Sequence, residues 1–183
     1  DNDLAYRLVS EKLNGEIPDE FVRAAFLHKK VEIHKDIAEK FAKPYEKRSW
    51  SDYRKIFVKE SRVSAGEKFY NNNKNLIAEV AKEYAVDPFV IVTIAGVESN
   101  YGIHHSQYSV FNSLYSQIHD MPRRSKWATR ELAEFLKYCY KDKLGTQDIG
   151  GSYAGAFGFG QFIPSSFTRY SVDFDNNDVR EPY

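Results

Sequence analysis

The sequence predicts an all-α domain. Apolar residues recur three and four positions apart along most of the chain, and proline and glycine separate the periodic segments. We find no convincing period-two alternation of the kind that marks a half-buried strand. At 183 residues the expectation is one domain with a small helical part attached, and 42% hydrophobic residues are enough for a core.

The predicted helices begin close to the N-terminus. Residues 3–14 and 19–42 have apolar positions at helical spacing, with Pro18 and Pro44 as breaks. A further amphipathic stretch runs over residues 50–63. These segments predict a helical N-terminal part.

Three polar stretches follow different patterns. Acids and bases alternate between His28 and Lys47, which predicts one solvated helix face. Residues 64–67 (Ser-Ala-Gly-Glu) match a capping box and predict a helix running to Tyr84. Residues 102–125 are polar, so we expect irregular structure there with a short helix near Leu114.

The clearest helices lie in the second half of the chain. Asp87 can cap a helix over residues 88–98, whose first residue is a proline. A helix is also predicted over residues 127–144, ended by Gly145, and another from Pro164.

The single cysteine, Cys139, excludes an internal disulfide framework. It shares a helical apolar stripe with four other residues: Ala128, Leu132, Phe135 and Leu136. We therefore expect Cys139 to be a small buried hydrophobic residue.

Glu98 is the strongest candidate for acid–base chemistry. It follows Ile94 and Ala95 by four and three residues, with Ile91 and Val90 one turn earlier, so it shares an apolar stripe. Partial burial there would raise the pKa of the carboxyl group and let it exchange a proton near neutral pH. The alternative is a helix-end glutamate that reaches water or pairs with an arginine.

Residues 150–167, the Gly/aromatic segment, contain half of the ten glycines of the chain. Tyr153, Phe157, Phe159 and Phe162 are interleaved with these glycines and can anchor the segment in a core. The glycines would then let backbone approach a ligand closely. No Gly-Lys-Ser/Thr follows, so a nucleotide-phosphate loop is not expected, whereas a tight structural connection between helices is the alternative.

Three motifs together resemble one known family. The motifs are Glu-Ser-Asn-Tyr-Gly at 98–102, Pro-Arg-Arg at 122–124 and the long Gly/aromatic motif at 151–166. In order and spacing they resemble the membrane-bound lytic transglycosylase B family of bacterial cell-wall enzymes, from about Ser64 to the C-terminus. The long motif is the specific one, because Glu-Ser-x-x-Gly is shared with other lysozyme-like enzymes.

The resemblance implies a fold and a domain organisation. We expect a lysozyme-like helical catalytic core over residues 64–183, preceded by a helical N-terminal part over residues 1–63. The family usually continues well past Tyr183, so the core is expected to be truncated at its C-terminus.

The resemblance also implies a chemistry and a set of site residues. The family cleaves the β-1,4 bond between N-acetylmuramic acid (MurNAc) and N-acetylglucosamine (GlcNAc) without water, giving 1,6-anhydromuramoyl products. Glu98 would act as general acid and then as base. Ser152 and Gln161 would form hydrogen bonds with the sugars. Arg123 and Arg124 would bind a carboxylate of the substrate. Tyr101, Tyr153 and Phe159 would pack against sugar faces.

Two alternatives remain open at this point. A lysozyme-type hydrolase would need a second carboxylate, such as Asp148, to activate water. The other acids between Ser99 and Val172 are expected in polar surroundings. The second alternative is an inactive glycan-binding module that keeps the fold.

Residues 173–179 resemble the first half of an EF-hand loop. Asp173, Asp175 and Asn177 would supply oxygen ligands, with the Val179 carbonyl at the seventh position. Asp178 replaces the usual glycine, so an acidic surface turn is the alternative. No cofactor is expected to be required, and calcium is a candidate ligand.

Charge and composition limit the partners. The chain has 26 basic and 26 acidic residues, which gives no electrostatic reason to expect nucleic acid. The expected partners are peptidoglycan glycan strands and, secondarily, other cell-wall enzymes, with the protein itself a monomer. The resemblance implies the periplasm or cell envelope, with membrane anchoring through a removed N-terminal segment as one arrangement.

Overall fold

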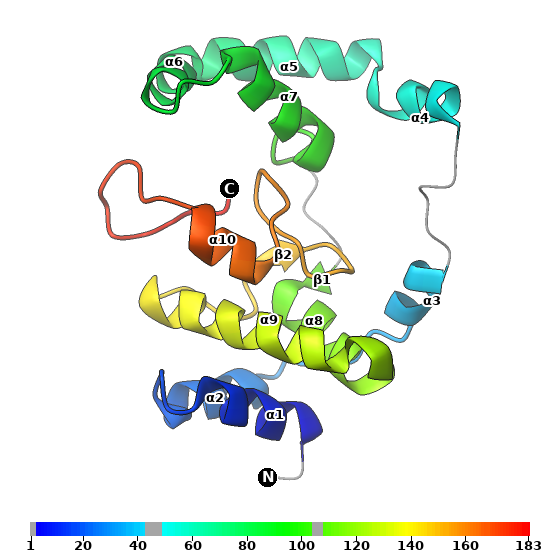
Figure 1. The fold of residues 1–183 in the computed structure, drawn as a ribbon, viewed down its shortest axis with the longest axis vertical. Coiled ribbons are helices and arrows are strands. Elements are labelled where there is room, and N and C mark those ends of the chain that lie inside the picture. Colours follow the sequence, from blue (N-terminus) through cyan, green and yellow to red (C-terminus); the bar gives the residue numbers. More distant parts are fainter. Residues whose placement is uncertain (1–2, 43–48, 104–107) are drawn as a thin grey trace. The chain divides into compact units, whose positions relative to one another are not determined.

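The structure, a computed structural model, describes residues 3–42, 49–103 and 108–183. The described residues form ten helices and a two-stranded sheet, which confirms the all-α prediction (Figure 1). No helix in the described ranges is long and apolar enough to cross a membrane.

The chain divides into two compact units. Unit 1 combines Asp1–Lys43 with residues 106–182, and unit 2 contains Pro44–His105. This division does not coincide with the expected boundary between residues 63 and 64. The first helices share an apolar core with helices after residue 108, so chain order alone does not define the units.

Unit 1 is built around two long helices. Its elements are α1 (Leu4–Leu13), α2 (Asp19–Phe26), α3 (Asp36–Ala42), β1 (Tyr108–Ser109), α8 (Val110–Asp120), α9 (Pro122–Lys141), β2 (Gly150–Gly151) and α10 (Pro164–Tyr170). Helix α9 lies between α1 and α10 and packs along α8 (Figure 1). The side chains of Leu114, Leu132 and Phe157 are fully buried in this core.

The two short strands hold the Gly/aromatic segment against α8. Strands β1 and β2 pair antiparallel, with Tyr108 opposite Gly151 and Ser109 opposite Gly150. A Cβ atom at Gly151 would lie 2.6 Å from Cγ2 of Val110, so only glycine lets the strand approach α8 this closely.

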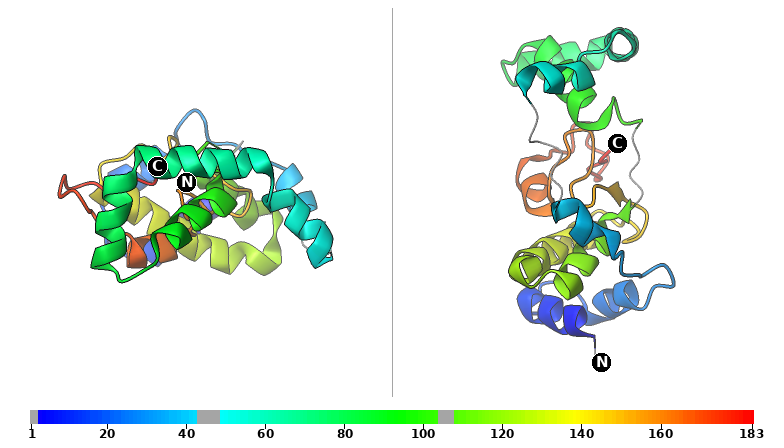
Figure 2. Two further views of the ribbon diagram at one scale, coloured as in Figure 1. Left: turned by 90° about the horizontal axis from the view of Figure 1, so that it is seen from above. Right: turned by 90° about the vertical axis from the view of Figure 1, so that its right-hand side faces the viewer.

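Unit 2 is a small helical group. It contains α4 (Trp50–Phe57), α5 (Glu60–Asn72), α6 (Lys74–Glu83) and α7 (Pro88–Ser99). Both α5 and α6 pack against α7, and α7 lies across α5 (Figure 2).

The predicted helix over residues 19–42 is wrong in its middle. Helix α2 ends at Phe26 and α3 begins at Asp36, so the expected solvated helix face is interrupted by turns and irregular structure over residues 27–35. The last residues of that expected face, 43–47, lie outside the described residues. The backbone of segment 27–35 bonds to α8: the Lys30 carbonyl accepts a hydrogen bond of 2.8 Å from Asn112. Tertiary partners thus replace the hydrogen bonds of a helix.

The predicted helix start at residues 64–67 is also wrong. Ser64 lies inside α5, which begins at Glu60, and Asn73 separates α5 from α6. A run of three asparagines is a weak helix former, so the break falls there instead.

The described part of the stretch 102–125 is more regular than predicted, and residues 104–107 lie outside the described ranges. Helix α8 covers residues 110–120, and its first nine residues are all buried. Because four of these buried residues are polar, the sequence shows no clear apolar periodicity here. The four are Asn112, Ser113, Ser116 and Gln117. Cys139 is fully buried as predicted, and burial raises the pKa of its thiol.

Candidate active site

Helix α7 begins as the sequence predicts. The Asp87 carboxylate accepts a hydrogen bond of 2.7 Å from the N–H of Phe89, and Pro88 is the first helical residue. The cap satisfies an N–H group that has no partner inside the helix.

Glu98 lies on the exposed side of α7, so the expected partial burial is not found. The buried side is formed by Val92, Ala95, Gly96 and Ser99. Helix α7 is apolar around most of its circumference, and the apolar stripe that Glu98 shares is therefore not the packed one. Glu98 makes no hydrogen bond or ion pair with any residue that the structure describes.

Large apolar side chains precede the glutamate on the exposed part of α7. Val90 and Ile94 are each 50% exposed, and Val97 is 41% exposed. An apolar surface with a single carboxyl group in it can bind a sugar ring and donate a proton to it.

The Glu-Ser-Asn-Tyr-Gly motif fixes the backbone just after the glutamate. The Ser99 hydroxyl accepts a hydrogen bond of 3.1 Å from the N–H of Gly102 and donates one to the Ala95 carbonyl. Asn100, Tyr101 and Gly102 all have positive φ, at 49°, 61° and 77°. This conformation is unfavourable for a tyrosine, so its side-chain contacts must hold it there.

Tyr101 is packed inside unit 2. Its hydroxyl donates a hydrogen bond to the Arg62 carbonyl, and its ring lies 5.3 Å from that of Phe69. A Cβ atom at either Gly66 or Gly96 would come within 2.5 Å of the Tyr101 hydroxyl. The two glycines thus make room for a tyrosine that joins α5 to the end of α7.

The other predicted residues lie in unit 1, where Ser152 organises the start of the Gly/aromatic segment. Its hydroxyl accepts hydrogen bonds from the N–H groups of Ala154 (3.2 Å) and Ala156 (3.1 Å). Its carbonyl accepts another, of 2.9 Å, from the Ser113 hydroxyl. Among the described residues the Ser152 O–H has no acceptor, so it can donate to a ligand.

Gln161 lies in a tight turn further along the segment. It has a φ of 48°, and its amide nitrogen donates to the Gly158 carbonyl at 3.0 Å. This leaves the amide oxygen of Gln161 as the group that can accept from a sugar hydroxyl.

The aromatic residues of the segment have different surroundings. Phe157 is fully buried against Phe135, Tyr138 and Phe167, which anchors the segment as predicted. Phe159 is 36% exposed. It can therefore offer part of its ring to a ligand, which Phe157 cannot.

The two arginines also differ. Arg124 lies between the rings of Phe41 and Trp127, at 4.5 and 4.2 Å from their centroids, and donates to Gln117 at 2.8 Å. Burial lowers the pKa of its guanidinium group. Arg123 is exposed and has no ion pair within the described part of the chain.

Sequence reasoning missed two residues that position the segment. Gln117 is fully buried, and its amide nitrogen donates to the Tyr153 carbonyl at 3.1 Å. Glu131 is fully buried too, and accepts a hydrogen bond of 2.9 Å from the N–H of Ser165 at the start of α10. The signal that could have identified Gln117 and Glu131 is a polar residue on the buried face of a helix.

Two acids contradict the expectation of polar surroundings. Besides Glu131, Asp142 is buried and bonds to Arg180 at 2.6 and 3.0 Å. Asp148 is exposed, and its N–H donates to the Gly145 carbonyl in a turn. Of these three acids, only Asp148 is open to solvent.

The acidic turn folds around Asp173. Its carboxylate accepts hydrogen bonds from the N–H groups of Asn177 (3.1 Å) and Asp178 (2.8 Å). Asp178 has a φ of 68°, the conformation that the usual glycine would adopt. The oxygen-rich ligand set suits calcium, although the Asn177 amide nitrogen points at Asp175 and the amide would have to turn. No cluster of three or more His, Cys, Asp or Glu suited to a metal occurs among the described residues.

The structure thus groups the predicted residues in two sets. Glu98 and Tyr101 belong to unit 2. Unit 1 joins Arg124, Gln117, Tyr153 and Ser152 through hydrogen bonds and α8, and it also carries the remaining predicted residues: Arg123, Phe159, Gln161, Asp173, Asp175 and Asn177.

The chain is similar in sequence to known proteins. Residues 5–182 match the Transglycosylase SLT domain family. The chain is 33% identical over 129 residues to the membrane-bound lytic murein transglycosylase B of Escherichia coli K12. That match covers 70% of this chain and 36% of the relative, so the chain spans little more than a third of that protein.

Solved structures agree with the sequence match. The soluble lytic transglycosylase SltB1 of Pseudomonas aeruginosa superposes with a TM-score of 0.89 at 33% identity, over 98% of this chain and 60% of that one. SltB3 of the same species, in complex with NAG-NAM-pentapeptide, gives a TM-score of 0.89 at 29% identity, over 98% of this chain and 47% of that one. The Escherichia coli Slt35 structure with calcium gives a TM-score of 0.86 at 24% identity, over 99% of this chain and 58% of that one, and shares the fold.

Because the family match extends over nearly the whole chain and includes all three motifs, the chain belongs to the Transglycosylase SLT domain family.

Proposed function

We propose that this protein is a lytic transglycosylase that cleaves the β-1,4 bond between MurNAc and GlcNAc in peptidoglycan and leaves a 1,6-anhydromuramoyl end. The observation that carries the proposal is the Glu98 carboxyl group at the end of the apolar helix α7, exposed and without a hydrogen-bond or ion-pair partner among the described residues. The turn that follows it is built from the other residues of the family motif.

Glu98 would perform both proton transfers. As an acid, it gives its proton to the bridging oxygen while the bond from that oxygen to the muramoyl C1 breaks. The resulting carboxylate takes the proton of the C6 hydroxyl as that oxygen attacks C1. The proton is returned to Glu98, no water is consumed, and the two products together have the atoms of the substrate.

A single carboxylate suffices for this route. Hydrolysis of the usual kind needs a second one, about 5–9.5 Å from the first. Glu131 and Asp142 are buried and already hydrogen-bonded, which disfavours them for that role. Asp120, Glu134 and Asp148 are not buried; we keep Asp148 as the acid to test and assign a catalytic role to none of them.

We propose different roles for the predicted substrate residues. The O–H of Ser152 and the amide oxygen of Gln161 would bond sugar hydroxyl or acetamido groups, and Arg123 would bind a carboxylate of the substrate. Tyr153 and Phe159 would pack against sugar faces.

Arg124 and Tyr101 would act as positioning residues. Arg124 holds Gln117, which in turn bonds the Tyr153 carbonyl, and Tyr101 holds the end of α7. Both side chains are engaged within their own unit, so an indirect role suits them better than the substrate contacts expected from the sequence.

The natural substrate would be peptide-bearing glycan strands in the cell envelope. The relative SltB3 was solved with NAG-NAM-pentapeptide, and the relatives are described as both membrane-bound and soluble. Asp173, Asp175 and Asn177 would hold a calcium ion that stabilises the turn after α10. We propose a monomer without a required cofactor.

Mass spectrometry of fragments released from purified sacculi tests the proposal. Fragments that end in 1,6-anhydromuramic acid, lighter by one water than hydrolytic products, are the expected result. Reducing ends would show hydrolysis and direct attention to Asp148, whereas release that persists in a Glu98→Gln variant would contradict the assignment of Glu98.

A further inference from the structure

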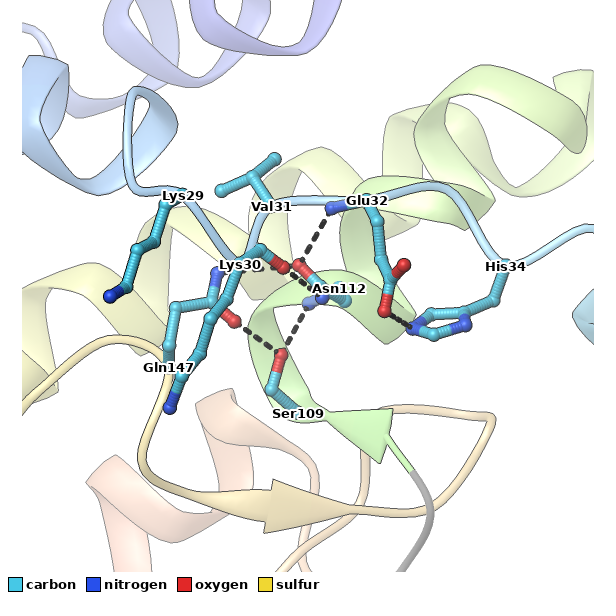
Figure 3. Close-up of a pocket in the computed structure, with 8 residues that line it drawn as sticks. All are labelled: Lys29, Lys30, Val31, Glu32, His34, Ser109, Asn112 and Gln147. Atoms are coloured by element: carbon cyan, nitrogen blue, oxygen red, sulfur yellow. Dashed lines mark hydrogen bonds and ion pairs between the residues drawn. The ribbon is translucent and has the colours of Figure 1, made fainter.

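A polar pocket of about 420 Å³ lies in unit 1, beside segment 27–35 (Figure 3). Its volume is in the range of small-ligand sites. Eight residues line it: Lys29, Lys30, Val31, Glu32, His34, Ser109, Asn112 and Gln147.

The wall of the pocket is held rigidly. The Asn112 amide oxygen accepts hydrogen bonds from the N–H of Glu32 (3.4 Å) and from Gln147 (3.3 Å), and its nitrogen donates to the Lys30 carbonyl (2.8 Å). The Ser109 hydroxyl donates to the Gln147 amide oxygen at 2.8 Å. Gln147 keeps a second amide N–H, which can donate to a ligand.

The charges on the two sides of the pocket differ. Figure 3 shows the ammonium groups of Lys29 and Lys30 on one side and the Glu32 carboxylate beside His34 on the other. Neither ammonium group has an ion pair or hydrogen bond within the described residues. Helix α8 begins beside Ser109, and the positive end of its dipole adds to the field of the lysines.

We propose that this pocket binds the carboxylate end of a peptide, namely the stem peptide that branches from a glycan strand. The inference rests on the proposed function. The lysines would attract the carboxylate, and Gln147 would donate to a peptide oxygen.

The position of the pocket along the fold supports this ligand. Ser109 pairs with Gly150, and the same strand continues within two residues to Ser152, the proposed sugar-binding residue. An extended pentapeptide spans about 17 Å. A stem attached to a sugar at Ser152 can therefore run along β1 and β2 towards the lysines.

Titration of the whole protein with a synthetic stem pentapeptide tests the site directly. Binding should be followed by NMR or calorimetry, with the C-terminal amide of the same peptide as the control ligand. The free acid should bind more tightly than the amide. The Lys29→Gln/Lys30→Gln double variant should weaken binding of the acid about four- to twentyfold, since each exposed ion pair contributes about two- to fivefold.

Lys141→Gln is the matched control variant, because Lys141 is an exposed lysine at the end of α9, outside the pocket. It should bind the acid as the unmodified protein does. Equal binding of acid and amide, an equal loss in the Lys141 variant, or complete displacement by equimolar inorganic phosphate would overturn the proposal.

Kinetics separate this inference from the proposed function. For the double lysine variant, the ratio of KM on peptide-bearing strands to KM on peptide-free strands should rise about four- to twentyfold. An unchanged ratio would refute a role for the pocket in turnover. If neither strand releases anhydromuramoyl ends, the proposed function fails, and the peptide titration alone decides whether the pocket is a peptide site.

Discussion

The end of α7 and the Gly/aromatic segment are both tight, glycine-containing turns, but they are held in different ways. After Glu98, the turn is closed by residues of its own motif, as in the hydrogen bond from Gly102 to Ser99. The Gly/aromatic segment depends on side chains more than thirty residues away, including Gln117 and Glu131. A short motif can therefore describe the hydrogen bond that closes the first turn, although the Tyr101 side chain is also held by α5, whereas the second segment needs the core of unit 1.

The largest effect should come from Glu98 itself. Replacing it with glutamine removes the proton donor and acceptor but keeps the shape, so we expect turnover to fall about 10²- to 10⁴-fold while glycan binding remains. Release of anhydromuramoyl fragments and binding to sacculi should be measured together. Asp148→Asn is the matched control, and a loss of similar size in that variant would indicate a two-carboxylate enzyme instead.

The distant anchoring of the Gly/aromatic segment can be broken at Glu131. Alanine there leaves the Ser165 N–H without its partner and opens a cavity, which should lower the free energy of unfolding by about 2–4 kcal/mol. Glutamine keeps an acceptor oxygen, and the loss should be about 1 kcal/mol. Urea unfolding measures both values.

Glu134→Gln is the control for this experiment. Glu134 lies on the same helix and pairs with Lys137 at 2.6 Å, but it is partly exposed and contacts no part of the Gly/aromatic segment in the bonds described. The free energy of unfolding of the Glu134→Gln variant should fall by less than about 1 kcal/mol. Equal losses in the Glu131→Ala and Glu134→Gln variants would show that α10 does not depend on the buried carboxylate.

The packing that holds the turn after Glu98 against α5 can be tested through Tyr101 and its two glycines. Gly66→Ala and Gly96→Ala should each destabilise the protein by about 1–3 kcal/mol, because the new methyl group meets the tyrosine. At Gly66 the close contact is the hydroxyl, at 2.5 Å, with the next ring atom at 3.2 Å. At Gly96 the ring carbon Cζ is also close, at 2.6 Å.

Tyr101→Phe should therefore relieve one substitution and not the other. In that background Gly66→Ala should become neutral or slightly stabilising, since alanine favours a helix over glycine by about 0.5–1 kcal/mol. Gly96→Ala should remain destabilising. A double-mutant cycle measured by thermal unfolding would contradict this geometry if both substitutions were rescued equally.

The parts of the structure that follow from the sequence are the locally determined ones. The Asp87 cap, Pro88 and the turn after Glu98 use residues that are neighbours in the chain. The burial of Cys139 followed from a clear apolar stripe. The orientation of Glu98 did not follow from the sequence, because a helix that is apolar on all sides does not show which side will be packed.

The parts that sequence reasoning missed depend on tertiary hydrogen bonds. The side chain of Asn112 replaces the helical partners of segment 27–35, and no local pattern indicates that a distant asparagine will do so. Helix α8 was hidden for a related reason, since its buried residues include Ser113 and Gln117, whose partners lie in the Gly/aromatic segment. The candidate site was predicted by motif, and its supporting residues were not.

The smallest effect is expected from calcium binding at the turn around Asp173. Like the end of α7, this turn is closed by hydrogen bonds between residues close in the sequence. Asp173 already accepts two backbone hydrogen bonds, and the neighbouring residues offer fewer oxygens than the six to eight that calcium takes. With a dissociation constant near 1 mM, about 5 mM calcium would add roughly 1 kcal/mol to the free energy of unfolding. The melting temperature should rise slightly with calcium, fall with chelator, and respond less to magnesium or in an Asp175→Asn variant. A melting curve that calcium leaves unchanged would mean that the carboxylate of Asp173 serves the backbone of the turn and not an ion.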